Sequence, residues 1–204
     1  QASERGFNRR FGVEFEAFGV NMSTLSDALN AAGIYTVIEN YNHTTRRHWK
    51  IVTDASINGR QGFEVVSPIL EGEAGIEEMK KVCRVLNECG AKVNRSCGTH
   101  VHIDAQSIGL RTWKNIYINY ARLENVIDGF MPLSRRKNNN HYCSGFSEIS
   151  NFEERIELAR SLREIENFFC SRYFKINPKS YARHNTIEFR QHGGTVDFEK
   201  ISNW

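Results

Sequence analysis

Gly12-Val13-Glu14-Phe15-Glu16-Ala17 alternates apolar residues with acidic ones. Side chains two residues apart in a β-strand lie on the same face, so this stretch predicts an acidic face and an opposite face in a core. His100-Val101-His102-Ile103-Asp104 and Glu188-Phe189-Arg190 alternate in the same way. Acids, histidines and an arginine at this spacing indicate a sheet face that binds a divalent metal ion and phosphate. The apolar residues expected in the core are Val13, Phe15, Ala17, Val101, Ile103, Ile187 and Phe189.

The composition predicts a globular chain with one sizeable core, since 40% of its 204 residues are hydrophobic. Its 27 basic and 24 acidic residues nearly balance, so charge does not favour nucleic acid as a partner. No apolar run reaches the roughly 18 residues of a membrane span. The five cysteines lack the spacing of a zinc site or a full disulfide framework, which favours a reducing, cytoplasmic setting.

The order of expected elements predicts an α+β fold, a mostly antiparallel sheet with helices packed on one face. A cap at Ser23-Thr24 is expected to open the first helix, and the hairpin is expected to join the second and third strands. A polar loop, Ser134–Ser147, separates the two longest helices. The expected strands are 7–20, 48–52, 63–66, 99–104 and 186–191, and the expected helices are 25–32, 75–86, 110–130, 152–169 and 198–204.

Three acidic residues lie within apolar strands. Glu14 and Glu16 share one strand face, and like charges side by side are most simply kept by a shared divalent cation. A solvent-facing edge pair is the alternative. Glu64 is a third acid in an apolar strand, for which a surface position is the alternative. Because hard acids outnumber soft ligands, the set favours Mg²⁺ or Mn²⁺ over zinc.

The histidine strand offers two further groups. His100 and His102 fit metal ligation or phosphate contact, while a buried structural histidine is the alternative for either. Their neighbour Asp104 has a second interpretation as a cap of the following turn.

The basic candidates are arginines. Arg190 would lie beside any metal-bound phosphate, which arginine binds bidentately. The following Gly193-Gly194-Thr195 fits a backbone anion nest or an ordinary tight turn. Arg135 and Arg136 fit a solvated charge run or a mobile lid that contacts phosphate. The sequence has no P-loop and no serine or Cys/His nucleophile motif.

The ordered motifs resemble the amidoligase family, which is similar to the carboxylate–amine ligases glutamine synthetase and glutamate–cysteine ligase. The resemblance covers about residue 11 to Trp204. It is carried by 11–16, Trp49, 54–57, 64–68, 97–102, Arg135-Arg136, 186–190 and Gly194-Thr195. It implies a glutamine-synthetase-like catalytic domain over residues 1–204, cut short within a helix at Trp204.

The resemblance also implies an ATP-dependent ligase with Mg²⁺ or Mn²⁺. Glu14, His102 and Glu188 would form one metal group, and Glu16 with Glu64 another. Phosphate and nucleotide contacts would come from His100, His102, Arg135, Arg136 and Arg190. In the reaction, a carboxylate oxygen attacks the γ-phosphate of ATP, and an amine then displaces phosphate from the acyl phosphate. Asp54 is the candidate that binds or deprotonates this amine.

Two other functions stay open at this point. A metal-dependent amidohydrolase also uses H-x-H, but it would need a further His/Asp set and a barrel of about 250 residues. A nucleic-acid-binding module would rest on 135–140 with Tyr117, Tyr120 and Tyr142, against the near-neutral charge. The expected partners are small-molecule or peptide carboxylates and amines, with no membrane, and nucleic acid is not favoured as a partner.

Overall fold

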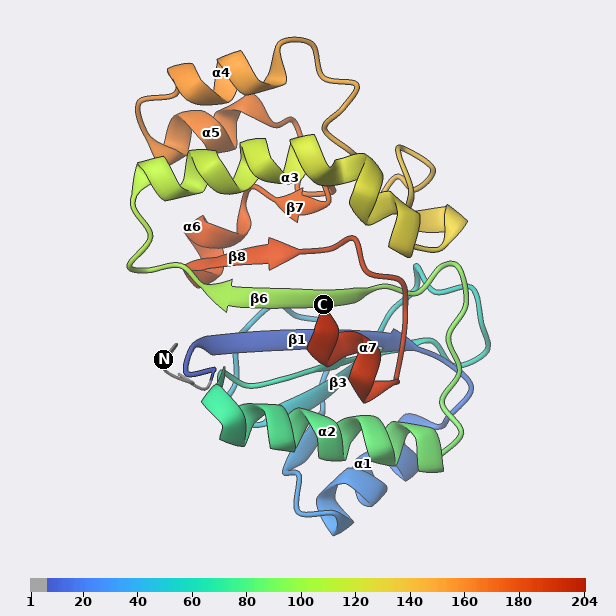
Figure 1. Cartoon of the computed structure of the whole chain (residues 1–204). Helices are drawn as coiled ribbons and strands as arrows, with labels where there is room; N and C mark the ends of the chain where they lie inside the picture. Colours follow the sequence, from blue (N-terminus) through green and yellow to red (C-terminus); the bar gives the residue numbers. More distant parts are fainter. Residues whose placement is uncertain (1–6) are drawn as a thin grey trace, which may run out of the picture. The chain divides into compact units, whose positions relative to one another are not determined.

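The computed structural model describes residues 7–204. Within them the chain divides into two compact units, here called the first unit (residues 7–103 and 194–204) and the second unit (residues 104–193). Figure 1 shows the order of their helices and strands. The expected α+β class is confirmed, with mostly antiparallel strands. The expectation of one catalytic domain over residues 1–204 stays a prediction.

The first unit is built on a sheet with β1 at its centre. Strand β1 pairs antiparallel with β4, β5 and β6, and β4 pairs antiparallel with β3. The expected hairpin of β3 and β4 is therefore confirmed, while β2 adds to β3 in parallel. The strand bounds are β1 Arg10–Ala17, β2 Thr36–Ile38, β3 Trp49–Thr53, β4 Phe63–Val66, β5 Leu70–Glu71 and β6 Thr99–Asp104.

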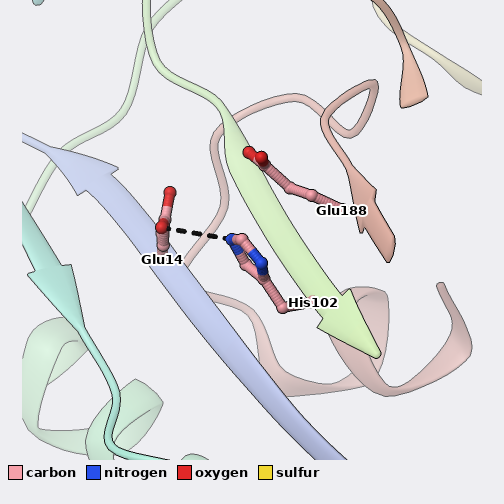
Figure 2. A group of neighbouring side chains, drawn as sticks. All are labelled: Glu14, His102 and Glu188. Atoms are coloured by element: carbon pink, nitrogen blue, oxygen red, sulfur yellow. Dashed lines mark hydrogen bonds and ion pairs between the residues drawn. The ribbon is translucent and has the colours of Figure 1, made fainter. Parts of the chain in front are cut away.

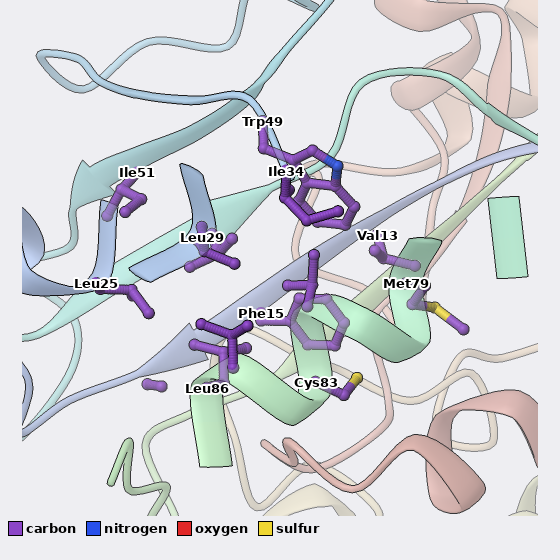
Figure 3. Close-up of a cluster of buried hydrophobic side chains, with 14 of the residues drawn as sticks. Val13, Phe15, Leu25, Leu29, Ile34, Trp49, Ile51, Met79, Cys83 and Leu86 are labelled. Atoms are coloured by element: carbon purple, nitrogen blue, oxygen red, sulfur yellow. The ribbon is translucent and has the colours of Figure 1, made fainter. Parts of the chain in front are cut away.

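One face of this sheet carries the hydrophobic core (Figure 3). Val13, Phe15 and Ala17 of β1 lie in this core, as the alternation predicts, and Val101 and Ile103 pack against it. Helices α1 (Met22–Ala31), α2 (Gly72–Glu88) and α7 (Phe198–Asn203) contribute buried residues to the same cluster. Within the first unit, the described helices therefore cover the apolar face of the sheet and leave the acidic face to the site.

Helix α1 begins one turn earlier than its sequence suggests. Its N-cap is Asn21, whose Oδ1 accepts hydrogen bonds from the backbone N–H groups of Ser23 at 2.9 Å and Thr24 at 3.4 Å. The prediction that Ser23-Thr24 forms the cap was therefore wrong. Asparagine is as good a cap as serine, and its side chain reaches the same free N–H groups.

The second unit is mainly helical. Helix α3 (Leu110–Phe130) has the predicted bounds, and η1 (Leu133–Arg135) follows it. Strands β7 (Ile176–Asn177) and β8 (Thr186–Phe189) pair antiparallel, with α6 (Ser180–His184) between them. The short β7 and α6 have no counterpart among the predicted elements. None of the helices in residues 7–204 is long and apolar enough to cross a membrane.

The predicted helix at residues 152–169 was wrong, because two helices occupy this stretch. Helix α4 (Phe152–Leu158) ends before Ala159, and α5 (Leu162–Phe168) begins after Ser161. The Oγ of Ser161 accepts from the N–H of Glu164 at 3.2 Å, while Glu164 Oε2 accepts from the N–H of Arg160 at 2.7 Å. This resembles a capping box, and the Ser-x-x-Glu spacing in the sequence was the signal for a new helix start.

Candidate functional site

The strand register builds the acidic face row by row. His100 of β6 pairs with Glu14 of β1, which pairs with Val66 of β4, which pairs with Lys50 of β3. Directly paired residues point to the same face, and neighbouring strands lie about 4.8 Å apart. These four side chains therefore form one row across the helix-free face of the first unit.

A second row lies beside the first and carries two further acids. Glu16 pairs with Glu64, which pairs with Val52. On the other side of the first row, His102 pairs with Gly12. All five first-unit residues that the sequence predicted for metal or phosphate binding are thus brought together on one face, namely Glu14, Glu16, Glu64, His100 and His102.

Glu14 lies at the centre of this arrangement. Its Oε2 is 2.9 Å from Nδ1 of His100. Its Oε1 is 3.3 Å from Nε2 of His102, the contact drawn as a dashed line in Figure 2. Burial opposes the ionisation of Glu14, but the hydrogen bonds from the two imidazoles outweigh it and hold its pKa well below the usual value. Glu14 is therefore a carboxylate whose negative charge is held in place for a ligand.

The pKa of Glu64 is shifted in the opposite direction. Burial raises its pKa well above the usual value, and the charges of Glu14, Glu16 and Asp54 raise it further. A hydrogen bond between the Glu64 and Glu14 carboxyls contributes to this rise. Without a cation, the pair therefore favours one proton shared between two carboxyl groups.

The residues present fit a hard divalent cation. One ligand atom each from Glu14, Glu64 and His100 lies within 4.8 Å of the others. Two half-buried carboxylates that repel each other are stabilised when a metal ion replaces the shared proton. This donor set suits Mg²⁺ or Mn²⁺, and the binding of either ion stays a prediction.

Glu16 is held by a different set of contacts. Its Oε2 accepts from the backbone N–H of Gly98 at 2.6 Å, and its Oε1 is 3.6 Å from Nε2 of His100. His100 therefore lies between the carboxylates of Glu14 and Glu16. The grouping of Glu16 with Glu64 as a second metal site stays a prediction, supported by their direct pairing in the sheet.

Two other residues adjoin this face. Asp54 follows β3, and its Oδ1 accepts from the N–H of Ser56 at 2.8 Å and from its Oγ at 2.6 Å. Its role toward the amine stays a prediction. Lys50 was missed by sequence reasoning, although a lysine inside the apolar stretch Trp49–Thr53 was a signal for a buried charge. Only 3% of Lys50 is exposed.

In the second unit, Glu188 and Arg190 form a buried ion pair. Arg190 donates from Nη1 to Glu188 Oε1 at 2.6 Å, and Asn177 donates from Nδ2 to Glu188 Oε2 at 2.6 Å. The Nε of Arg190 also donates to the carbonyl of Tyr142 at 3.3 Å. The guanidinium is thus fixed at a set orientation. The grouping of Glu188 with Glu14 and His102, and phosphate contact by Arg190, stay predictions.

Arg135 is not part of a solvated charge run, because only 2% of it is exposed. Its Nη1 donates to the carbonyl of Arg190 at 3.4 Å, while its buried Nε has no hydrogen-bond partner within the described residues. An orphaned guanidinium N–H suits an anionic ligand. Arg136 donates from Nε to the carbonyl of Met131 at 2.7 Å. Phosphate contact by this pair stays a prediction.

The segment after Arg135 is tied to a buried ion cluster. Lys175 is fully buried, and its Nζ lies 2.6 Å from Glu124 Oε1 and 2.7 Å from Asp128 Oδ1. These carboxylates also accept backbone N–H groups, from Lys137 at one end of the segment and Phe146 at the other. The predicted lid is therefore held at both ends, and its motion stays a prediction.

The glycines after Arg190 support the tight-turn interpretation. The N–H of Gly194 donates to the carbonyl of Cys97 at 2.8 Å, and that of Thr195 donates to Thr99 Oγ1 at 3.2 Å. A Cβ at Gly194 would lie 2.4 Å from that of Cys97, so only glycine fits here. These two N–H groups serve the fold of the first unit.

A comparison with protein families identifies the chain. A family model described as "Putative amidoligase enzyme" matches residues 7–204, nearly the whole sequence. The chain belongs to this family. The resemblance to the amidoligase family is therefore confirmed, while the relation to glutamine synthetase and glutamate–cysteine ligase stays a prediction. Membership of the amidoligases indicates an enzyme that forms amide bonds. No curated protein sequence matches this amidoligase.

Proposed function

We propose that this amidoligase is an ATP- and Mg²⁺-dependent carboxylate–amine ligase that forms an amide or isopeptide bond through an acyl phosphate. One observation carries the proposal. Glu14 and Glu64 lie on one helix-free face of the sheet, with His100 beside them. The pKa of Glu14 is lowered, whereas that of Glu64 is raised. Family membership supplies the class of bond that is formed.

The residues of the face would hold the metal. Glu14, Glu64 and His100 supply the ligand atoms, with His102 fixing the Glu14 carboxylate from the other side. When bound, Mg²⁺ would offset the negative charge of the ATP phosphates. We propose Glu188 as a further ligand, because its place two residues before Arg190 repeats the alternation of the other strands.

The arginines would act on the transferred phosphoryl group. Arg190 is oriented by Glu188 and Tyr142, so its charge is placed before ATP arrives, and preorganised charge is the main source of rate enhancement in such transfers. Arg135 would offer its unpartnered Nε to a phosphate oxygen. The carboxylate substrate attacks the γ-phosphate, ADP leaves, and the carbonyl carbon becomes an electrophile.

The second half of the reaction needs a neutral amine. The amine attacks the acyl phosphate, inorganic phosphate leaves, and the amine nitrogen loses a proton. We propose that Asp54, at the end of β3, binds or deprotonates this amine. The carboxylate and amine are small molecules or peptides, with a glutamyl γ-carboxylate as one candidate for the carboxylate.

An ADP-release screen across amino acids, polyamines and γ-glutamyl acceptors would identify the substrates. Labelling then tests the mechanism. With an ¹⁸O-labelled carboxylate, ligation through an acyl phosphate transfers one label into the released phosphate, and hydroxylamine in place of the amine yields a hydroxamate. Label-free phosphate alongside genuine amide product would contradict the acyl-phosphate route. Amide hydrolysis without ATP would instead identify a metal-dependent amidohydrolase.

A matched pair of variants links this chemistry to the site. Glu14→Gln keeps the shape of the side chain and removes its charge, so labelled phosphate should disappear while the fold survives. Glu77→Gln is the control, because Glu77 is 66% exposed on α2 and pairs only loosely with Lys80 at 3.9 Å. Full activity in Glu14→Gln would show that the acidic face is not the catalytic site.

A further inference from the structure

Lys50 is a buried cation on the acidic face that the proposed chemistry does not use. Its strand position places it in the same row as Glu14, with Val66 between them, so it lies about two strand spacings from Glu14. Burial of a lysine is rare unless its ammonium is fully hydrogen-bonded. The contacts of Lys50 should therefore show what it does.

The ammonium of Lys50 reaches a single loop. It donates three hydrogen bonds, each 2.9 Å long, to the carbonyl of Asn42, the Oδ1 of Asn42 and the carbonyl of Thr44. These contacts use all three of its N–H donors. All three acceptors are neutral. Through space, the positive charge interacts first with the carboxylate of Glu39 and then with those of Glu64 and Glu14.

A second set of contacts holds the same loop. Glu39 accepts from Arg46 at 3.0 Å and contacts His48 at 2.9 Å. The hydrogen bond from Arg46, followed by that from His48, lowers the pKa of Glu39 to about 2. Glu39 thus ties the two ends of residues 40–48 together, and Lys50 holds the middle of the loop from the sheet face.

We propose that Lys50 is a positioning residue that holds residues 42–44 beside the acidic face, where the loop 40–48 forms a wall of the carboxylate-substrate site. The inference rests on the proposed function and names a residue and a loop for it. Among the exposed side chains of the loop, Tyr41 is aromatic and Arg47 is basic, which suits an anionic substrate, while the guanidinium of Arg46 pairs with Glu39. Lys50 also places one positive charge near the metal ligands.

Two variants separate these roles. Lys50→Met removes the hydrogen bonds and the charge, whereas Lys50→Arg keeps the charge but cannot reproduce three hydrogen bonds from one ammonium. We expect Mn²⁺ alone, titrated by calorimetry, to bind Lys50→Met about threefold to tenfold more tightly, because a nearby positive charge is lost. Lys50→Arg should bind Mn²⁺ like wild type. Lys80→Met, an exposed lysine on α2, is the control.

The loop and substrate readouts complete the test. Amide hydrogen exchange in residues 40–48 should speed up in both Lys50 variants, measured without substrate. With hydroxylamine as the amine, the KM for the carboxylate found in the ADP-release screen should rise at least about tenfold in both variants, with kcat and the KM for ATP nearly unchanged.

The outcomes are distinguishable. Faster loop exchange with an unchanged carboxylate KM would overturn the substrate-wall role, and unchanged exchange would overturn the positioning role. Weaker Mn²⁺ binding in Lys50→Met would show that the residue only supports the fold. If wild type bound no Mn²⁺ and turned over no ATP, the proposed function itself would fail, whatever the loop exchange showed.

Discussion

Replacing Glu64 by glutamine should stabilise the metal-free protein and at the same time weaken metal binding. Glu64 is half-buried beside the Glu14 carboxylate, and loss of solvent followed by repulsion from Glu14 raises its pKa well above the usual value. Glutamine resembles the protonated form of Glu64, since it can donate a hydrogen bond to Glu14 without a charge. The substitution therefore removes an electrostatic penalty but also a metal ligand.

The pH dependence follows from the direction of the pKa shift. Between the ordinary pKa of glutamate and the raised pKa of Glu64, the folded protein binds one more proton than the unfolded chain. The contribution of Glu64 to the free energy of unfolding of the metal-free protein therefore falls as the pH rises through this window, and this contribution is constant above the raised pKa. In Glu64→Gln, this decrease of the free energy of unfolding with rising pH should be absent.

The expected magnitudes have opposite signs. At neutral pH, Glu64→Gln should gain at least about 1 kcal/mol in free energy of unfolding, the lower end of the cost of an unsatisfied buried group. Its affinity for Mn²⁺ should fall by at least about a hundredfold, because even outer-shell partners of a metal cost 10–100-fold when they are lost.

Urea denaturation at several pH values and Mn²⁺ calorimetry measure the two quantities. Glu77→Gln serves as the exposed control and should change the free energy of unfolding by no more than about 0.5 kcal/mol. If Glu64→Gln lowered stability and metal affinity together, the carboxylate would be a structural element, and the account of a strained metal site would be refuted.

Three further predictions concern the second unit. Arg190→Ala should cost about 3 kcal/mol of transition-state stabilisation. Arg190→Lys should also lose most ATP turnover, because an ammonium cannot form the two parallel hydrogen bonds of a guanidinium. Wild-type kcat at saturating ATP would make the residue structural. Lys175→Met should lower the free energy of unfolding by about 3–5 kcal/mol in urea denaturation, since it leaves two buried carboxylates unpaired. The exposed ion pair of Arg122 with Glu153 offers the control, because Arg122→Met should change the free energy of unfolding far less than Lys175→Met does. Amide exchange in residues 134–147 should slow when ATP and Mg²⁺ are added, and equal exchange would argue against a lid.

The acidic face was predictable because strand periodicity is short and local. In Gly12–Ala17 and Thr99–Asp104, every second residue is apolar, so the face of each side chain follows from its position alone. The structure confirms that Val13 and Phe15 lie in the core while Glu14 and His100 lie opposite. This inference did not require knowing which strands pair with one another.

The contacts that depend on distant partners were not predictable. Lys175 is separated by 51 residues from Glu124, and nothing in its local sequence indicates that it is fully buried. The burial of Arg135 also depends on distant contacts. Its polar surroundings in the sequence suggest a solvent-exposed loop, and only the structure shows the distant carbonyl that accepts its hydrogen bond. The break between α4 and α5, by contrast, had a local signal in Ser161 and Glu164 that periodicity concealed.

The charges of the first unit argue for a cation more strongly than any one contact. The imidazoles of His100 and His102 both approach Glu14, so neither contact offsets the charge of Glu64. The ammonium of Lys50 points to loop carbonyls, at 2.9 Å, instead of to a carboxylate. Sequences that fold without a ligand rarely keep a half-buried acid in this state, since a neutral residue would be more stable. The cost of Glu64 therefore supports the proposal that a divalent ion binds at the acidic face.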